Sequence, residues 1–199
     1  SASSLAEIRS IVSESYLLTD ETVLREHGHD ETEDLVYLPE AVAIPASTEE
    51  ISAIMKICYR ERIPVTVRGG GSGLAGGALP IRGGLIISMK RFDQILFIDE
   101  RNFQVTTQPG VVTETLQNTL KEKGLFYPPD PSSRGWSFIG GNISTNAGGP
   151  KAVKYGVVKD HVLNLQVVLP NGDIIWTGAN TLKNSTGYNL TQLLVGSEG

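Results

Sequence analysis

The spacing of apolar residues changes along the chain, and each spacing predicts a different kind of element. In residues 4–15, apolar side chains recur every three or four positions, which predicts a short amphipathic helix. The same period over residues 48–61 predicts a longer helix, which Ser47 and Glu50 would begin as a capping box. Cys58 lies on the apolar stripe of this second helix, so we predict that it packs in the core rather than acting as a catalytic thiol.

Short apolar runs predict the strands. Residues 41–44 and 64–67 flank the longer helix and complete a β-α-β unit with it. Further short strands, separated by polar turns, are expected over residues 85–88, 94–98 and 103–107. Two more runs, 162–169 and 173–177, are joined by Pro170-Asn171-Gly172 and predict a β-hairpin.

The second half of the chain mixes these signals with turn-rich sequence. A helix is predicted to begin at Thr113, as its N-cap, and to stop at Gly124. Residues 128–150 are dense in Pro, Gly, Ser and Asn and show little periodicity. Without an internal repeat, these elements predict an α+β fold that divides near residue 100. The chain closes on residues 190–199, an apolar run expected to form a strand before a glycine turn, and we therefore expect it to be a fragment of a longer protein.

Composition narrows the classes of function. The 40% hydrophobic and 20% charged residues are ordinary for a globular protein, but the 22 glycines are concentrated in a few runs. A net charge of −5 argues against a nucleic-acid partner, and the single cysteine cannot form an internal disulfide. The sequence shows neither an apolar run of about 18 residues nor a signal-peptide pattern. We therefore expect a cytoplasmic protein without a transmembrane segment, which could still attach to the periphery of the inner membrane through partners.

Residues 25–34 form a polar, acidic stretch that contains two histidines. Two histidines beside five carboxylates could bind a metal. A solvated loop is the favoured interpretation, because the stretch lacks the helix or strand period that would give ligands a fixed geometry. No metal site is predicted.

The glycine-rich stretch of residues 68–77, called the glycine loop below, follows the predicted strand 64–67. Residues 71–76 match the G-x-G-x-x-G pattern, but a Rossmann fingerprint must open a helix, and Pro80 and two further glycines prevent one here. A Walker A loop is excluded because no Gly-Lys-Ser/Thr closes the run. Consecutive small residues can aim several backbone N–H groups at one anion, and Ser72 adds a hydroxyl. The residues alone therefore predict an anion cradle, in which Arg68 either neutralises charge or has a structural role; a flexible linker is the weaker alternative.

A second run rich in Gly and Asn covers residues 139–149. Its glycine pairs allow close approach to a flat ligand, and Asn142, Ser144 and Asn146 offer neutral donors and acceptors. His161 precedes an apolar strand and is more readily explained by packing than by catalysis. Neither run contains a nucleophile–base pair, so no catalytic residue is predicted in this chain.

Five segments, taken together, resemble the FAD-binding domain of the vanillyl-alcohol-oxidase-like (PCMH-type) flavoprotein superfamily. The resemblance is closest to the branch that contains D-lactate dehydrogenase and the D-type subunit of glycolate oxidase, and it extends from about residue 37 to the end. The segments, in the family's order, are residues 64–73, 127–133, 139–149, 154–156 and 186–199.

This resemblance implies a two-subdomain α+β fold, not a Rossmann fold, with FAD between the subdomains. Residues 1–36 would form an N-terminal helix and loop, and the FAD-binding domain would span 37–199, with subdomains of about 37–100 and 101–199. The glycine loop would hold the pyrophosphate, and residues 137–149 would line the flavin and ribityl side. The FAD should be non-covalent, because the loop offers only Gly, Ser, Leu and Ala. Phe138 departs from the small polar residue often found there. The implied FAD-binding residues are Arg68, Gly69, Gly70, Gly71, Ser72, Gly73, Leu74, Gly76, Gly110, Pro129, Asp130, Ser137, Ile139, Gly140, Gly141, Asn142, Ser144, Asn146, Gly148, Gly149, Tyr155 and Gly156.

The function that this resemblance implies is oxidation of a D-2-hydroxy acid, such as glycolate or D-lactate, to a 2-oxo acid. The substrate would be held by a cap domain that follows Gly199, and the electron acceptor would be a quinone, an electron-transfer protein or oxygen. Three alternatives stay open: an FAD-binding fragment without turnover, an oxidase of the same superfamily acting on another alcohol, and a glycine-rich interaction protein without a cofactor.

Overall fold

The computed structural model describes residues 2–199, which form two compact units. The first unit comprises the chain up to Arg91 together with Gln166–Ile175, and the second comprises Phe92–Leu165 and Trp176–Gly199. The first unit is therefore built from two separate stretches of sequence.

A four-stranded sheet is the centre of the first unit. Its order is β1-β2-β4-β3: β2, β4 and β3 run parallel to one another, and β1 is antiparallel to β2. Val42 of β2 and Ile86 of β4 pair in register and are fully buried, which explains why both strands are continuously apolar. The strands are β1 (Leu17–Leu18), β2 (Ala41–Ala43), β3 (Val65–Arg68) and β4 (Leu85–Ser88).

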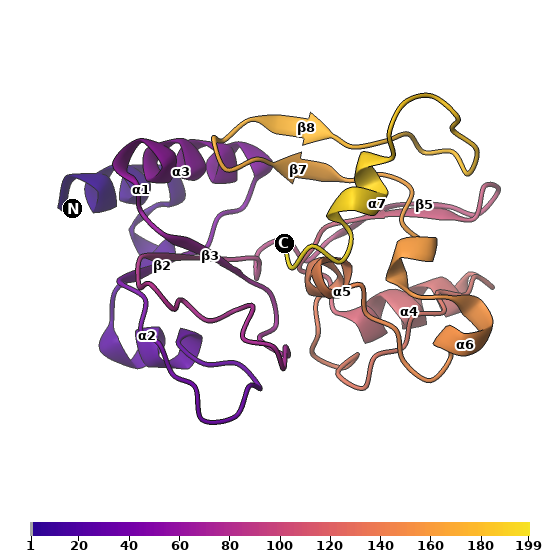
Figure 1. Cartoon of the computed structure of the whole chain (residues 1–199), viewed down its shortest axis with the longest axis horizontal. Helices are drawn as coiled ribbons and strands as arrows, with labels where there is room; N and C mark the ends of the chain where they lie inside the picture. The colour runs from indigo at the N-terminus through magenta and orange to yellow at the C-terminus, as the bar shows by residue number, and fades with distance from the viewer. Residues whose placement is uncertain (1) are drawn as a thin grey trace. The chain divides into compact units, whose positions relative to one another are not determined.

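Helix α3 (Thr48–Glu61) connects β2 to β3, as the predicted β-α-β unit requires. Its N-cap is Ser47, whose side chain accepts a hydrogen bond from the Glu50 N–H (3.1 Å), while the Glu50 carboxylate accepts one from the Ala46 N–H (2.7 Å). The predicted start of this helix is thus confirmed. Helix α1 (Ala2–Val12) lies beside α3 (Figure 1). Glu7 pairs with Arg60 across the two helices at 2.9 Å.

A short hairpin of β7 (Gln166–Val168) and β8 (Ile174–Trp176) confirms the hairpin predicted in this part of the chain. It is attached to α3, because Ser52 Oγ donates to the Gly172 carbonyl at 2.5 Å and Thr48 Oγ1 donates to Gln166 Oε1 at 3.0 Å. This attachment brings residues 166–175 into the first unit.

The second unit has an antiparallel hairpin and several short helices. Its elements are β5 (Ile95–Asp99), β6 (Gln104–Thr107), α4 (Thr113–Glu122), α5 (Ile139–Thr145), α6 (Ala152–Tyr155), the 3₁₀ helix η2 (Val158–Asp160) and α7 (Leu190–Leu194). A small core of Val111, Leu116, Leu120 and Ile139 holds α4 and α5 together, and apolar residues of the hairpin pack against it.

Four sequence-based expectations about elements are wrong in detail. Residues 25–27 end a helix, α2 (Glu21–His27), whose first turn is capped by Asp20 (Thr22 N–H to Oδ1, 3.0 Å), so the acidic stretch is not loop throughout. Residues 139–145 form a short helix despite two glycines, because Ile139 packs in the core.

Residues 190–194 are helical rather than extended, since Asn189 caps them by accepting from the Gln192 N–H (2.9 Å). Helix α4 has Val112, not Thr113, as its N-cap, because the Thr113 hydroxyl is used in a buried network described below.

Within residues 2–199, no helix is long and apolar enough to cross a membrane.

Cys58 is expected to be unreactive toward a thiol reagent such as DTNB in the folded protein. Its side chain is buried, and burial raises the pKa of the thiol to about 11, so little of the reactive thiolate is present at neutral pH. The absorbance of the thionitrobenzoate released from DTNB should rise only after guanidinium is added. The final absorbance should correspond to one thiol per protein molecule, since the chain has a single cysteine. Rapid reaction without denaturant would contradict this placement.

Candidate functional site

The glycine loop leaves the end of β3 with its backbone donors free. The last paired group of the strand is the Arg68 carbonyl, which accepts from the Met89 N–H at 2.9 Å. From Gly69 to Ala75, no backbone N–H has a hydrogen-bond partner among residues 2–199. A run of free N–H groups on small residues suits an anion such as a pyrophosphate. The loop therefore fits the pyrophosphate group of FAD.

The element that follows the glycine loop is β4, not a helix. This observation confirms that the G-x-G-x-x-G match is not a Rossmann fingerprint, since no helix N-terminus is available there.

The Arg68 side chain lies beneath the loop, in the interior of the first unit. It is only 9% exposed, and its Nη1 donates to the His27 carbonyl at 3.4 Å. Desolvation lowers the pKa of Arg68, while the nearby Asp30 carboxylate acts in the opposite direction. The guanidinium also explains Gly71: this residue has φ +71°, and a Cβ there would overlap Arg68 Nη2 and lie 2.8 Å from Cζ. The role of Arg68 as a direct ligand of FAD stays a prediction.

A segment that the sequence did not indicate as functional contacts the glycine loop. The Glu31 N–H donates to the Gly73 carbonyl at 3.1 Å, and the Gly76 N–H donates to Thr32 Oγ1 at 2.8 Å. The Asp30 carboxylate accepts from the Thr32 N–H at 2.9 Å, which forms an Asx-turn. We call Asp30, Glu31 and Thr32 the clamp segment. The Asp-x-Thr turn pattern was its only signal in the sequence, and nothing in that pattern shows what the turn contacts.

His27 and His29, which raised the question of a metal site, have separate hydrogen-bond partners. His27 Nδ1 lies 2.9 Å from the Val23 carbonyl, and His29 Nδ1 lies 3.1 Å from the Arg25 carbonyl. Burial lowers the pKa of His27. Across the part of the chain that the structure describes, no group of three His, Cys, Asp or Glu residues could hold a metal ion.

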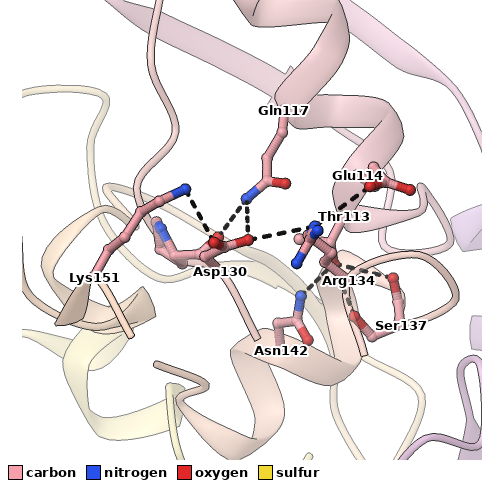
Figure 2. Close-up of polar contacts among 9 residues, drawn as sticks. Thr113, Glu114, Gln117, Asp130, Arg134, Ser137, Asn142 and Lys151 are labelled. Carbon is pink, nitrogen blue, oxygen red and sulfur yellow. Dashed lines mark hydrogen bonds and ion pairs between the residues drawn. The ribbon is translucent and has the colours of Figure 1, made fainter. Parts of the chain in front are cut away.

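In the second unit, Asp130 is the centre of a charged cluster (Figure 2). Its carboxylate pairs with Lys151 Nζ at 3.0 Å and with Arg134 Nε at 3.6 Å. Gln117 Nε2 donates to the Pro129 carbonyl at 2.8 Å and lies 3.4 Å from Asp130 Oδ1. The hydrogen bond from Lys151 is the main reason that the pKa of Asp130 is lowered, so this carboxylate stays ionised. Both oxygens of Asp130 therefore have partners within the unit.

A buried network of neutral groups joins α4, α5 and the loop before α5 (Figure 2). Asn142 Nδ2 donates to Thr113 Oγ1 at 2.5 Å, and Thr113 Oγ1 lies 3.0 Å from both the carbonyl and the hydroxyl oxygen of Ser137. All three side chains are almost fully buried. The network fixes the start of the 139–149 segment against α4.

The predicted glycines of the second unit differ in what surrounds them. A Cβ at Gly140 would lie 2.6 Å from Pro109 Cβ, and one at Gly149 (φ +112°) would overlap the Asp130 carbonyl. At Gly156 (φ +85°) it would overlap the Asp160 carboxylate. Packing at Gly140, packing together with a positive φ at Gly149, and chiefly the positive φ at Gly156 are enough to require glycine at these three positions. Gly141 has nothing within 4 Å of its Cβ position, so it has open space beside it.

Most of the other predicted residues make contacts inside their own unit. Ser144 Oγ donates to the Gly140 carbonyl (2.9 Å), and Asn146, in the left-handed conformation, accepts from the Lys159 N–H (2.9 Å).

Tyr155 contacts Phe126 edge to face, and its carbonyl lies 3.0 Å from His161 Nε2. The structure thus gives His161 a hydrogen bond with the Tyr155 carbonyl and an edge-to-face ring contact with Tyr127. The Gly110 N–H donates to Phe92 (2.7 Å), the Gly148 carbonyl accepts from Asp130 (2.9 Å), and Leu74 is exposed.

Comparison with known proteins identifies the family. The FAD binding domain family matches residues 39–178, most of the chain. The chain belongs to this family. The predicted resemblance to FAD-binding flavoproteins is confirmed, and FAD is the cofactor that this family binds.

Two curated relatives point to one branch of the family. The glycolate oxidase subunit GlcD of Bacillus subtilis is 50% identical over 173 residues, which cover 87% of this chain and 37% of that protein. The D-lactate dehydrogenase of Anaerostipes hadrus is 46% identical over 161 residues, or 81% of this chain and 34% of that protein. The chain thus spans little more than a third of the length of these relatives.

Solved structures confirm the mixed helix-and-sheet fold. An alkyldihydroxyacetonephosphate synthase covers the whole chain with a TM-score of 0.86 at 24% identity, and the match takes in 41% of that chain. A p-cresol methylhydroxylase with bound substrate matches 98% of the chain with a TM-score of 0.73 at 20% identity, over 40% of its own length. Both likenesses concern the fold alone.

Proposed function

We propose that this chain is the FAD-binding part of an enzyme that oxidises a D-2-hydroxy acid to the 2-oxo acid. The observation that carries the proposal is the run of unpaired N–H groups from Gly69 to Ala75 directly after β3, a parallel edge strand of the four-stranded sheet. The names of the relatives, a glycolate oxidase component and a D-lactate dehydrogenase, support the choice of substrate class.

In this proposal, the glycine loop binds the pyrophosphate of FAD through its free N–H groups. The buried positive charge of Arg68 beneath the loop favours an anion there. The 139–149 segment, held by the Thr113–Ser137–Asn142 network, lines the flavin and ribityl side, with the open space at Gly141 available for close approach. When bound, FAD supplies a two-electron acceptor for the hydride that leaves the substrate carbon. No residue of this chain is assigned the base that takes the hydroxyl proton.

We further propose that the FAD is held without a covalent bond. The residues of the glycine loop are Arg, Gly, Ser, Leu and Ala, none of which is a histidine or cysteine that could bond to the flavin. Acid precipitation of the yellow protein should leave the flavin in the supernatant. Flavin that stays with the pellet would contradict this part of the proposal.

The substrate class is tested by anaerobic mixing of the FAD-loaded protein with D-lactate or glycolate, with L-lactate as the stereochemical control. The experiment uses the full-length gene product and this chain in parallel. We expect D-lactate or glycolate to bleach the visible flavin band of the full-length protein, and L-lactate to leave it unchanged. Bleaching by neither acid would refute the substrate class, and a colourless protein that takes up no added FAD would refute the cofactor as well. Bleaching only in the full-length protein would show that the isolated chain binds FAD without turnover.

A further inference from the structure

We infer that the clamp segment positions the glycine loop for its anion, and that Thr32 is the side chain through which it does so. The inference rests on the proposed FAD binding, and it assigns a role to residues that lie outside both the glycine loop and the 139–149 segment. Thr32 is a positioning residue in this account, since it acts through the loop and not by contact with FAD.

The first step concerns the freedom of a glycine-rich backbone. Peptide planes next to glycine rotate with little steric resistance, so a loop of this composition does not by itself aim its N–H groups to one side. The loop has the conformation of an anion cradle only if something outside it fixes the peptide planes. The clamp segment contacts two of them, at Gly73 and at Gly76.

The second step concerns direction. In a trans peptide, the C=O and the following N–H point in opposite directions. Because the Gly73 carbonyl is directed to the Glu31 N–H, the N–H of Leu74 in the same peptide is turned away from the clamp segment and left free. The Gly76 N–H is directed to Thr32 Oγ1, which ends the run of free donors at Ala75. The clamp thus determines which side of the loop presents N–H groups and where that series stops.

The third step concerns how the clamp itself is held. Asp30 is 7% exposed and fixes the Thr32 backbone through Oδ1 at 2.9 Å. Its other oxygen, Oδ2, is buried, lies 3.8 Å from the Cβ position of Gly73, and has no hydrogen-bond partner in residues 2–199. The Arg68 guanidinium is near enough to Asp30 for the carboxylate to raise its pKa, and Arg68 also donates to the carbonyl of His27, three residues before Asp30. The clamp segment, Arg68 and the glycine loop are therefore joined by a continuous series of contacts.

The test is the affinity for FAD, measured by flavin fluorescence on apoprotein prepared from the full-length protein. Thr32→Val keeps the size of the side chain and removes the oxygen that accepts from Gly76. We expect it to weaken FAD binding roughly tenfold, the effect of one lost hydrogen bond that leaves an N–H unpaired. Thr32→Ser keeps the oxygen and should bind FAD within about twofold of the unchanged protein, because an intact acceptor restores the contact.

Thr22→Val is the matched control, since Thr22 is exposed on α2 and its hydroxyl makes no hydrogen bond within residues 2–199. It should leave the affinity unchanged. Equal affinities for Thr32→Val and Thr32→Ser would overturn the inference, whether both are normal or both are weak, because either result removes the hydroxyl from the argument. Failure of the unchanged protein to bind FAD would instead refute the proposed function, so the two outcomes are distinguishable.

Discussion

Replacing Gly71 by aspartate is expected to abolish retention of FAD through purification. Gly71 has φ +71°, and a Cβ at this position would overlap the guanidinium of Arg68, so either the loop or the arginine must move. The new carboxylate would also pair with Arg68 or oppose the pyrophosphate, and in both cases the positive potential of the loop falls. We expect FAD affinity to drop by at least about a hundredfold, which corresponds to nearly 3 kcal/mol. The ratio of flavin absorbance to protein absorbance after gel filtration measures the loss.

Gly124→Asp provides the control for this variant. Gly124 has φ +70°, almost the same backbone conformation, but nothing lies within 4 Å of its Cβ position. It therefore carries the same backbone strain and the same added charge without the overlap, and it should keep its FAD. Yellow colour retained by Gly71→Asp would refute the assignment of the loop as the pyrophosphate cradle.

Gly149→Ala is expected to lower the free energy of unfolding by about 3 kcal/mol or more, the range of severe backbone and packing defects. Gly149 has φ +112°, a conformation that residues with a side chain rarely adopt, and a Cβ there would overlap the Asp130 carbonyl. The Asp130 N–H donates to the Gly148 carbonyl at 2.9 Å, so the two backbone segments cannot separate without breaking this bond. Chemical denaturation of the apoprotein measures the change without any contribution from the cofactor.

Gly141→Ala separates this packing effect from a general intolerance of side chains in the 139–149 segment. Gly141 lies within α5 and has open space around its Cβ position, so alanine should leave stability unchanged or raise it by up to about 1 kcal/mol. If Gly149→Ala unfolds at the same denaturant concentration as Gly141→Ala, the close approach of residues 130 and 149 is wrong.

Local chemistry was sufficient to predict several parts of the fold and the site. The capping residues Ser47 and Glu50 and the apolar stripe after them mark α3 without reference to the rest of the molecule. The glycine loop could be separated from a Rossmann fingerprint because Pro80 and the glycines at 83 and 84 are incompatible with a helix. Each of these arguments uses residues that are close in sequence to the element they specify.

The parts that could not be predicted depend on contacts between distant residues. Thr32 and Gly76 are 44 positions apart, and nothing in either segment indicates that they form a hydrogen bond. Helix α5 contains two glycines and forms because Ile139 and the Asn142 side chain are buried against α4. The sequence also could not show that Gly140 and Gly149 are required by Pro109 and Asp130, since a glycine needed for packing and one needed for a ligand look alike.

The interrupted sequence of the first unit affects the order in which the chain can fold during synthesis. Residues 166–175 bind to α3 through Ser52 and Thr48, yet they are synthesised only after the whole stretch from Phe92 to Leu165. Up to that moment the surface of α3 that receives Gly172 has no partner, so the first unit is completed late even though it begins first. A truncation at Arg91 would therefore leave the first unit, which carries the glycine loop, without residues 166–175 and without their contacts to α3.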